Sequence, residues 1–221
     1  MNLPDDPLQP DRGWASASTP RLRPPPPNQR GWLMRALSII ARRFGRAELP
    51  DLFPLLNLHR GLFLPWLWFA SRLMPHGKLP APVREMLILR TGWNCRCRYE
   101  WGQHVDLALA AGVSDADILR TAGSPHTFAD PMLRSLMQAC DELWLDDVVS
   151  DTVWQALSAH WDAPCLIEIT MLVGHYRMLA SVINSAGLAL EAPTEARLQA
   201  FYQRAIPVRF QASNTRLREA G

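Results

Sequence analysis

The sequence lacks a strong net charge and a long apolar run. Its 221 residues carry a formal net charge of +2, which is too small to predict binding to nucleic acid or to an anionic membrane. The longest apolar stretch, from Leu62 to Ala70, contains Pro65 and is far shorter than the roughly 20 residues that a membrane-spanning helix needs. We therefore predict neither a nucleic-acid partner nor a membrane partner.

A secretory signal and a cysteine-rich metal motif are also missing. The first ten residues, MNLPDDPLQP, are acidic and interrupted by proline, so we expect a cytoplasmic protein. In that compartment the cysteines remain thiols unless two of them perform redox chemistry. No second pair accompanies Cys95 and Cys97, so we expect no zinc site and no other metal. The two remaining cysteines, Cys140 and Cys165, are interpreted as buried small hydrophobic residues.

Strict alternation of apolar and polar residues, the pattern of a half-buried strand, does not extend over more than a few residues. Apolar residues instead recur at helical spacing between turn signals from glycine and proline. This pattern predicts an all-α fold of about eight helices. The predicted helical segments are 31–44, two pieces within 51–74, 82–92, 95–111, a short piece after Ser114, 133–145, 151–160 and 164–184.

The chain divides into an arm and one domain. Residues 1–28 are rich in proline and arginine, include the run from Pro24 to Pro27 and contain little that could form a core, so we predict a disordered or polyproline arm. Residues 29–221 are predicted to form a single all-helical domain, because a chain of this length can bury one sizeable core. The nine tryptophans, a residue that fills cores and interfaces, predict a homo-oligomer.

The most informative segment runs from Glu85 to His104 and reads EMLILRTGWNCRCRYEWGQH. On a helix, Cys97, Glu100 and His104 would project from one face, flanked by Trp101. A thiol, a carboxylate and an imidazole beside an aromatic wall suit a proton-transfer site or an activated-thiol site. Glu85 lies on an otherwise apolar helix, where a buried carboxylate needs a partner such as His104. The four-residue spacing of Glu100 and His104, taken alone, is more typical of a surface pair on one helix than of a catalytic pair.

The order of Glu85, Cys97 and His104 resembles the core motif of the alkylhydroperoxidase D and carboxymuconolactone decarboxylase superfamily. The surrounding KLPAPVREMLILRTGWNCRCRYEWGQHVDLALAAGVSDADI is similar to the branch that carries Tyr-Glu-Trp before the histidine, and the later DELW and LIEITMLVGHYRMLASVINSAG resemble it as well. The resemblance covers about residues 48–192. It implies an alkylhydroperoxidase D-like helical domain that acts without a cofactor and assembles as a dimer, trimer or hexamer.

One departure from the motif affects the predicted activity. In the peroxidase members a second cysteine stands four residues before the histidine, and here that position is Glu100. Peroxide reduction needs an attacking and a resolving sulfur. Cys95 is a poor substitute, because a pair spaced like Cys95 and Cys97 on a helix points its sulfurs in different directions. A decarboxylase-like lyase or isomerase is therefore favoured over a thiol peroxidase that uses Cys97, and a non-catalytic oligomeric scaffold is the third alternative.

The resemblance also implies roles for individual residues. Glu85 would orient or relay a proton to His104, and His104 with Glu100 would move a proton next to a carbonyl or lactone of a small carboxylated substrate. Arginines are suited to holding a substrate carboxylate, although a surface salt bridge is an equal alternative for each. His175 and Tyr176 could line the same cavity or be satisfied at a subunit interface. The candidates for substrate binding are Arg84, Arg90, Arg98, Trp101, His175 and Tyr176.

Overall fold

The computed structural model describes residues 6–43 and 48–206. Within them the chain forms ten α-helices, two short 3-10 helices and no strand, which confirms the all-α prediction with two more helices than expected. The elements are η1 (Pro27–Gln29), α1 (Trp32–Arg43), α2 (Leu52–Leu56), α3 (Arg60–Leu73), α4 (Ala81–Asn94), α5 (Arg98–Ala110), α6 (Asp115–Thr121), η2 (Pro125–Thr127), α7 (Pro131–Leu145), α8 (Asp151–Ser158), α9 (Ala163–Ala186) and α10 (Ala192–Ala205). The predicted end of the first helix, near Gly45, lies outside the described residues.

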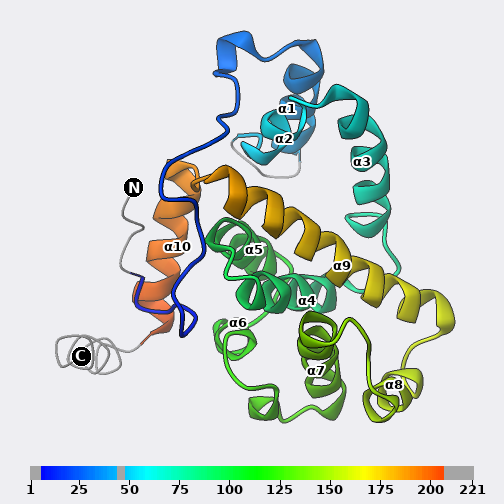
Figure 1. Ribbon diagram of the computed structural model, residues 1–221. Coiled ribbons are helices and arrows are strands. Elements are labelled where there is room, and N and C mark those ends of the chain that lie inside the picture. The colour runs from blue at the N-terminus through cyan, green and yellow to red at the C-terminus, as the bar shows by residue number, and fades with distance from the viewer. Residues whose placement is uncertain (1–5, 44–47, 207–221) are drawn as a thin grey trace.

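Helix α4 is the centre of the fold. It packs against α5, α7 and α9, while α1 to α3 lie at one end of the molecule and α7 and α8 at the other (Figure 1). Every residue from Arg84 to Gly92 is buried. A helix that is buried on all sides has no solvent-facing stripe for its charged residues. Charged side chains on α4 must therefore find partners within the protein.

The turn between α4 and α5 differs from the sequence prediction. The second helix was expected to begin directly after Asn94, but α5 begins at Arg98, and Cys97 is its N-cap residue with extended backbone angles. Arg96 adopts a left-handed conformation with a φ of 54°, which reverses the chain between the two helices. Cys97 therefore does not share a helical face with Glu100 and His104.

Helix α9 is the longest helix. Asp162 caps its first turn, Pro164 lies within that turn, and Gly187 ends it with a φ of 71°. Its length and composition alone would allow it to cross a membrane, but 56% of its most apolar window is buried against the rest of the protein. Such burial is typical of a central core helix.

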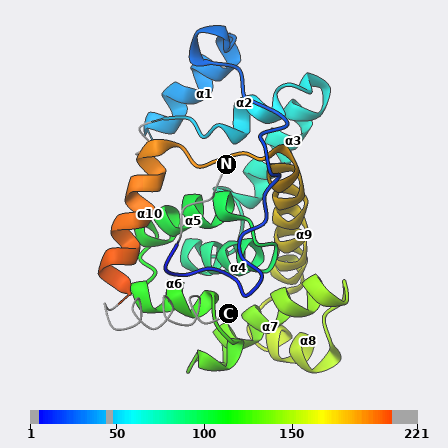
Figure 2. The same cartoon turned by 60° about the vertical axis from the view of Figure 1, so that its left-hand side comes forward.

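The described part of the proline-rich arm, from Asp6 onward, forms no α-helix before Trp32, yet it packs on the domain. It runs across the face between α9 and α10 (Figure 2). The backbone N–H groups of Ala15 and Ala17 donate to carbonyl oxygens of Arg96 and Asn184, at 2.8 and 3.0 Å. Trp14 is buried with its ring against other tryptophan rings of the core. From Asp6 onward the arm thus belongs to the packed protein.

Candidate active site

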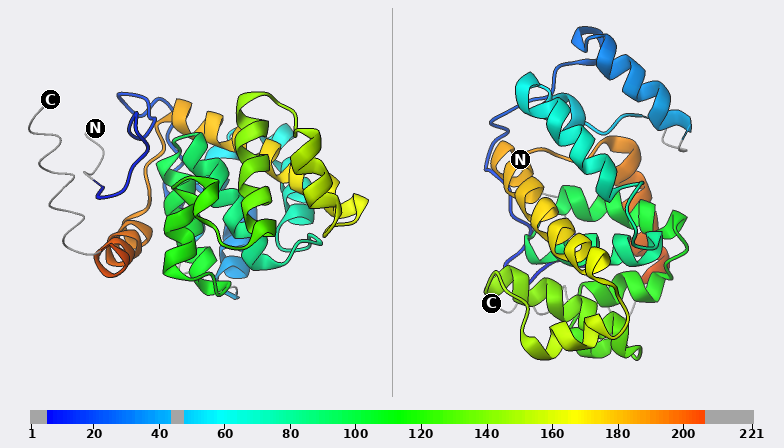
Figure 3. Two further views of the ribbon diagram at one scale, coloured as in Figure 1. Left: turned by 90° about the horizontal axis from the view of Figure 1, so that it is seen from below. Right: turned by 90° about the vertical axis from the view of Figure 1, so that its right-hand side faces the viewer.

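A cavity of about 500 Å³ lies among α1 to α5 and α9. Its wall is largely apolar and aromatic, and its size is in the range of sites for small molecules. Helix α3 lies beside α9 (Figure 3), and its residues form one side of the cavity. The polar and titratable side chains that line the cavity include Arg84, Glu85, Tyr99, Glu100, Gln103, His104, His175 and Tyr176.

Glu85 and His104 form a buried pair across the interface of α4 and α5. The distance from Glu85 Oε2 to His104 Nδ1 is 2.7 Å, and the residues are only 2% and 6% exposed. An ionised Glu85 accepts a hydrogen bond, so Nδ1 must donate it. In the neutral imidazole, Nε2 is then the nitrogen with a free lone pair, which is the form that a general base requires.

Arg84 brings a positive charge to the cavity wall beside this pair. Its Nε lies 3.4 Å from Oε1 of Glu85, and the residue is 8% exposed. The contact is long for a hydrogen bond, so its energy is mainly that of two nearby opposite charges. Arg84 is therefore placed to stabilise Glu85 and to attract a negatively charged group in the cavity.

Glu100 is a second carboxyl group in a very different environment. It is 3% exposed, and neither of its oxygens has a hydrogen-bond partner among the described residues. Burial raises the pKa of Glu100 well above its usual value. Burial thus favours the uncharged form of the side chain, which can donate a hydrogen bond or a proton. Two carboxyl groups in different environments are a recognised basis for acid and base roles in one site.

Cys97 does not line the cavity and is not an activated thiol. It is fully buried, and burial is the main cause that raises its pKa well above 9.0. Backbone N–H groups of Glu100 and Tyr99 offset only part of that increase. Burial also raises the pKa of Cys95 to about 12. Nucleophilic cysteines need the opposite, an accessible site with a lowered pKa.

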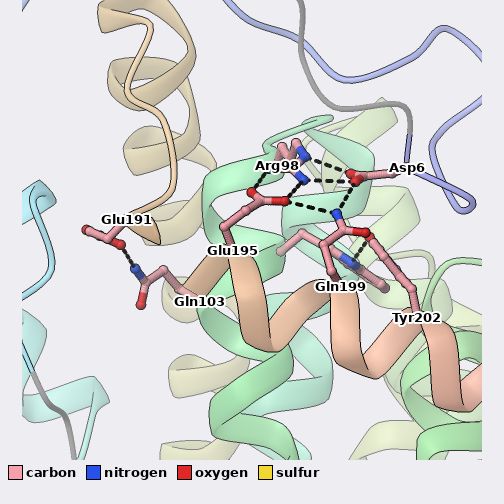
Figure 4. Close-up of polar contacts among 8 residues, drawn as sticks. Asp6, Arg98, Gln103, Glu191, Glu195, Gln199 and Tyr202 are labelled. Carbon is pink, nitrogen blue, oxygen red and sulfur yellow. Dashed lines mark hydrogen bonds and ion pairs between the residues drawn. The ribbon is translucent and has the colours of Figure 1, made fainter. Parts of the chain in front are cut away.

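Arg98 binds the arm and does not line the cavity. Its guanidinium donates to both carboxylate oxygens of Asp6 at 2.7 and 2.8 Å and to both of Glu195 at 2.6 and 2.7 Å (Figure 4). Asp6 in the arm and Glu195 on α10 are thus tied to α5. The guanidinium is engaged by these two carboxylates and lies outside the cavity lining, so the geometry does not support the predicted substrate contact.

Arg90 and Trp101 also have structural contacts in place of the predicted substrate contacts. Arg90 binds Asp141 through two bonds of 2.6 Å and donates to two backbone carbonyls between α6 and η2. Trp101 is fully buried, and its Nε1 donates to the hydroxyl of Tyr202 at 3.0 Å. Neither residue lines the cavity.

His175 and Tyr176 do lie in the cavity wall. The Tyr176 ring makes a T-shaped contact with each histidine, since its centroid is 5.0 Å from that of His104 and 5.4 Å from that of His175. His175 stacks on Trp66, with centroids 6.2 Å apart and an interplanar angle of 14°. Burial lowers the pKa of His175 to about 4, so its imidazole is neutral at physiological pH.

The cavity wall also contains Trp66, Tyr99 and Gln103, which were not predicted from the sequence. Glu191 accepts hydrogen bonds from the Tyr99 hydroxyl at 2.7 Å and from Gln103 Nε2 at 2.5 Å, which fixes both side chains. Tyr99 and Gln103 are four residues apart on α5, so helical spacing next to Glu100 was an available signal. Trp66 had no such signal, because it lies in an apolar run. In the described part of the chain, no group of three or more His, Cys, Asp or Glu side chains could hold a metal ion.

The helical architecture is that of an alkylhydroperoxidase D-like domain. A peroxidase-related protein from Ralstonia eutropha JMP134, described as an alkylhydroperoxidase AhpD core, superposes with a TM-score of 0.70 at 16% identity, over 80% of this chain and 96% of that one. A peroxidase-related protein from Silicibacter sp. TM1040 gives a TM-score of 0.71 at 11% identity, over 83% and 97% of the two chains. The debrominase Bmp8, a cysteine-to-alanine variant bound to 2,3,4-tribromopyrrole, gives 0.68 at 11% identity, over 84% and 100%.

Comparison of the sequence with known protein families gives a match. Residues 64–142, which include Glu85, Glu100 and His104, match the carboxymuconolactone decarboxylase family. No curated protein matches the chain in sequence. The match over residues 64–142 and the shared fold both support the carboxymuconolactone decarboxylase and alkylhydroperoxidase D-like superfamily.

Proposed function

We propose that the protein is a cofactor-independent lyase or isomerase that transfers protons by general acid and base catalysis on a small carboxylated or lactone-like substrate. One observation carries this proposal. The cavity contains a Glu85–His104 pair at 2.7 Å and, beside it, the buried carboxyl of Glu100 without a hydrogen-bond partner among the described residues. A base and an acid with separate environments are thus available to one bound molecule.

Each group has a distinct task in this mechanism. Nε2 of His104 removes a proton from the carbon next to the substrate carbonyl, and Glu85 stabilises the imidazolium that forms. The neutral carboxyl of Glu100 donates a hydrogen bond to the carbonyl oxygen, where negative charge develops. In an isomerisation His104 then returns the proton to another carbon. In a decarboxylation the bond to carbon dioxide breaks in place of the C–H bond, its electron pair moves onto the carbonyl oxygen as an enolate, and protonated His104 delivers a proton taken from solvent to that carbon. Arg84 attracts the carboxylate of the substrate.

A thiol-dependent peroxidase that uses Cys97 has less support. The sulfur is buried outside the cavity, and its raised pKa keeps it protonated. The peroxidase-related neighbours share the fold at 16% identity or less, and that likeness supports the fold alone. The debrominase complex supports only the idea that a domain of this architecture can hold a small planar ring. A non-catalytic scaffold has no use for an uncharged, unpaired carboxyl in a cavity, which costs free energy.

Proton exchange with solvent tests the proposal without knowledge of the natural substrate. The protein is incubated in deuterium oxide with a panel of unsaturated γ-lactones and keto acids, each with and without a carboxylate side chain, and proton NMR follows deuterium incorporation at the carbon next to the carbonyl. We expect exchange in at least one carboxylated member. His104→Gln should abolish it, while His126→Gln, a change at an exposed histidine of η2, should not. Equal exchange in the His104 variant overturns the proposal.

We also propose that the protein forms a homo-oligomer through α1 and α3. Trp32, Leu62 and Trp68 on these helices are 75%, 64% and 65% exposed, so large apolar side chains gather beside the cavity. Exposed apolar groups of this size are typical of interfaces between subunits. Light scattering should give a mass above that of one chain. A monomer at micromolar concentration would contradict this proposal.

A further inference from the structure

Two buried ring nitrogens in the cavity wall have no hydrogen-bond partner among the described residues: Nε1 of Trp66 and Nδ1 of His175. Trp66 comes from α3 and His175 from α9, and both residues line the cavity. Their rings are nearly parallel, at 14°, with centroids 6.2 Å apart, so the two residues form one stacked unit. Phe69 makes a T-shaped contact with His175, with centroids 5.4 Å apart. Buried polar groups are rarely left unpaired, so these atoms call for a partner that enters the cavity.

The chemistry of this unit differs from that of the Glu85–His104 end. The indole N–H of Trp66 can only donate a hydrogen bond. The imidazole of His175 is uncharged at neutral pH, because burial lowers its pKa to about 4. Arg84 is the one lysine or arginine in the described lining of the cavity, and its ionic contact is with Glu85. The stacked unit therefore offers hydrogen bonds without a positive charge.

We propose that Trp66 and His175 form a neutral subsite that binds an uncharged oxygen, a carbonyl or a hydroxyl, of the substrate. The Tyr176 ring contacts both this subsite and His104, with centroid distances of 5.4 and 5.0 Å to the two imidazole rings. The substrate is thus a small, mostly apolar molecule with a reactive or carboxylated end near Arg84 and a second, uncharged oxygen near His175. The assignment of the reactive end rests on the proposed function, whereas the neutral subsite rests on the unpaired nitrogens.

Three compounds of nearly equal shape test the subsite by binding alone. Acetophenone carries an uncharged carbonyl, α-methylstyrene replaces that oxygen by a methylene group, and benzoate replaces the methyl group of acetophenone by a charged oxygen. Each is titrated into the full-length protein labelled with nitrogen-15 at tryptophan. Acetophenone should move the indole N–H resonance of Trp66 downfield and bind about three- to tenfold more tightly than α-methylstyrene, the effect of one hydrogen bond gained in a buried site.

Variants then assign the preference to the two rings. Trp66→Phe and His175→Phe should each bring the affinities for acetophenone and α-methylstyrene close together. His175→Asn, whose amide can donate from nearly the position of Nδ1, should retain the preference. Trp154→Phe on α8 is the matched control, because Trp154 is 41% exposed, does not line the cavity and should change neither affinity.

The outcomes separate this inference from the proposed function. No preference for acetophenone in the unmodified protein, an unmoved Trp66 resonance, or a stronger dependence of benzoate than of acetophenone on His175 overturns the neutral subsite. A protein that prefers acetophenone as described, but exchanges no carbon-bound proton in the lactone assay, overturns the proposed function and leaves the subsite standing.

Discussion

Oε2 of Glu85 lies 2.7 Å from Nδ1 of His104, and both side chains are almost completely shielded from water. The pair joins the buried helix α4 to α5 and fixes the orientation of the imidazole in the cavity. This contact supplies the partner that the buried carboxylate of Glu85 needs on the otherwise apolar helix α4. It also determines which nitrogen of His104 is able to accept a proton.

Replacement of Glu85 by Gln should keep the hydrogen bond and remove the charge. The imidazolium that forms during proton transfer then loses its stabilisation, so we expect an exchange rate lower by roughly 10²-fold or more. The lactone assay measures this rate, and circular dichroism checks that the fold persists. Glu48→Gln, at an exposed position, is the control. An unchanged rate in Glu85→Gln would show that the pair has no part in the chemistry.

The protonation of Glu100 predicts how stability depends on pH. Burial raises the pKa of this carboxyl in the folded protein above its value in the unfolded chain, so the group favours the folded state at acidic pH. That contribution is complete below the unfolded value and is lost as the pH rises toward the folded value, with a slope of up to about 1.4 kcal/mol per pH unit.

Glu100→Gln removes the titrating group and retains the shape of the side chain. We therefore expect the wild-type protein to lose unfolding free energy relative to this variant as the pH rises from the ordinary glutamate value of 4.5 to neutrality. Urea denaturation at several pH values measures the difference. A difference that stays constant over that range would mean that Glu100 is ionised in the folded protein.

The thiols should differ in reactivity according to burial. Cys165 is partly exposed, whereas Cys97 and Cys140 are 0% and 1% exposed. A small alkylating reagent should modify Cys165 first and reach Cys97 only when the protein unfolds, because the raised pKa of Cys97 also keeps the sulfur protonated. Peptide mass spectrometry over time gives the order. Rapid modification of native Cys97, or its sulfenic acid after mild peroxide, would support the thiol-dependent alternative.

The arm should contribute to stability through Asp6. This residue is 1% exposed and accepts two hydrogen bonds from Arg98. Asp6→Asn leaves Arg98 with one fewer negative partner in a buried setting, so we expect a loss of roughly 1–3 kcal/mol in unfolding free energy. The exposed Asp11 provides the comparison, and Asp11→Asn should change stability by less than about 0.5 kcal/mol. Equal stability of the two variants would show that the arm is not held by this contact.

The sequence predicted the helices well because their apolar spacing and their caps are local. Pro164 and Gly187, for example, mark the first turn and the end of α9. The docking of the arm could not be predicted in this way. Asp6 meets Arg98 across 92 residues of sequence, and a proline-rich segment carries no periodic pattern that indicates burial.

The candidate site was predictable in part for the same reason. Glu85, Glu100 and His104 have side chains whose chemistry stands out on apolar helices, and the cavity contains all three. Cys97 was placed on their face only because α5 was expected to begin before it, whereas a left-handed residue at Arg96 delays the helix. Trp66 in the cavity depends on how α3 packs on α9, a long-range contact that composition does not reveal.

The most direct test of the account compares three variants in the deuterium exchange assay: His104→Gln, Glu100→Gln and Cys97→Ala. If His104 and Glu100 act as base and acid, their variants should lose about 10²- to 10⁴-fold in rate, while Cys97→Ala should exchange at nearly the wild-type rate. Retained exchange in both cavity variants, together with loss in Cys97→Ala alone, would contradict proton transfer and assign the chemistry to the sulfur.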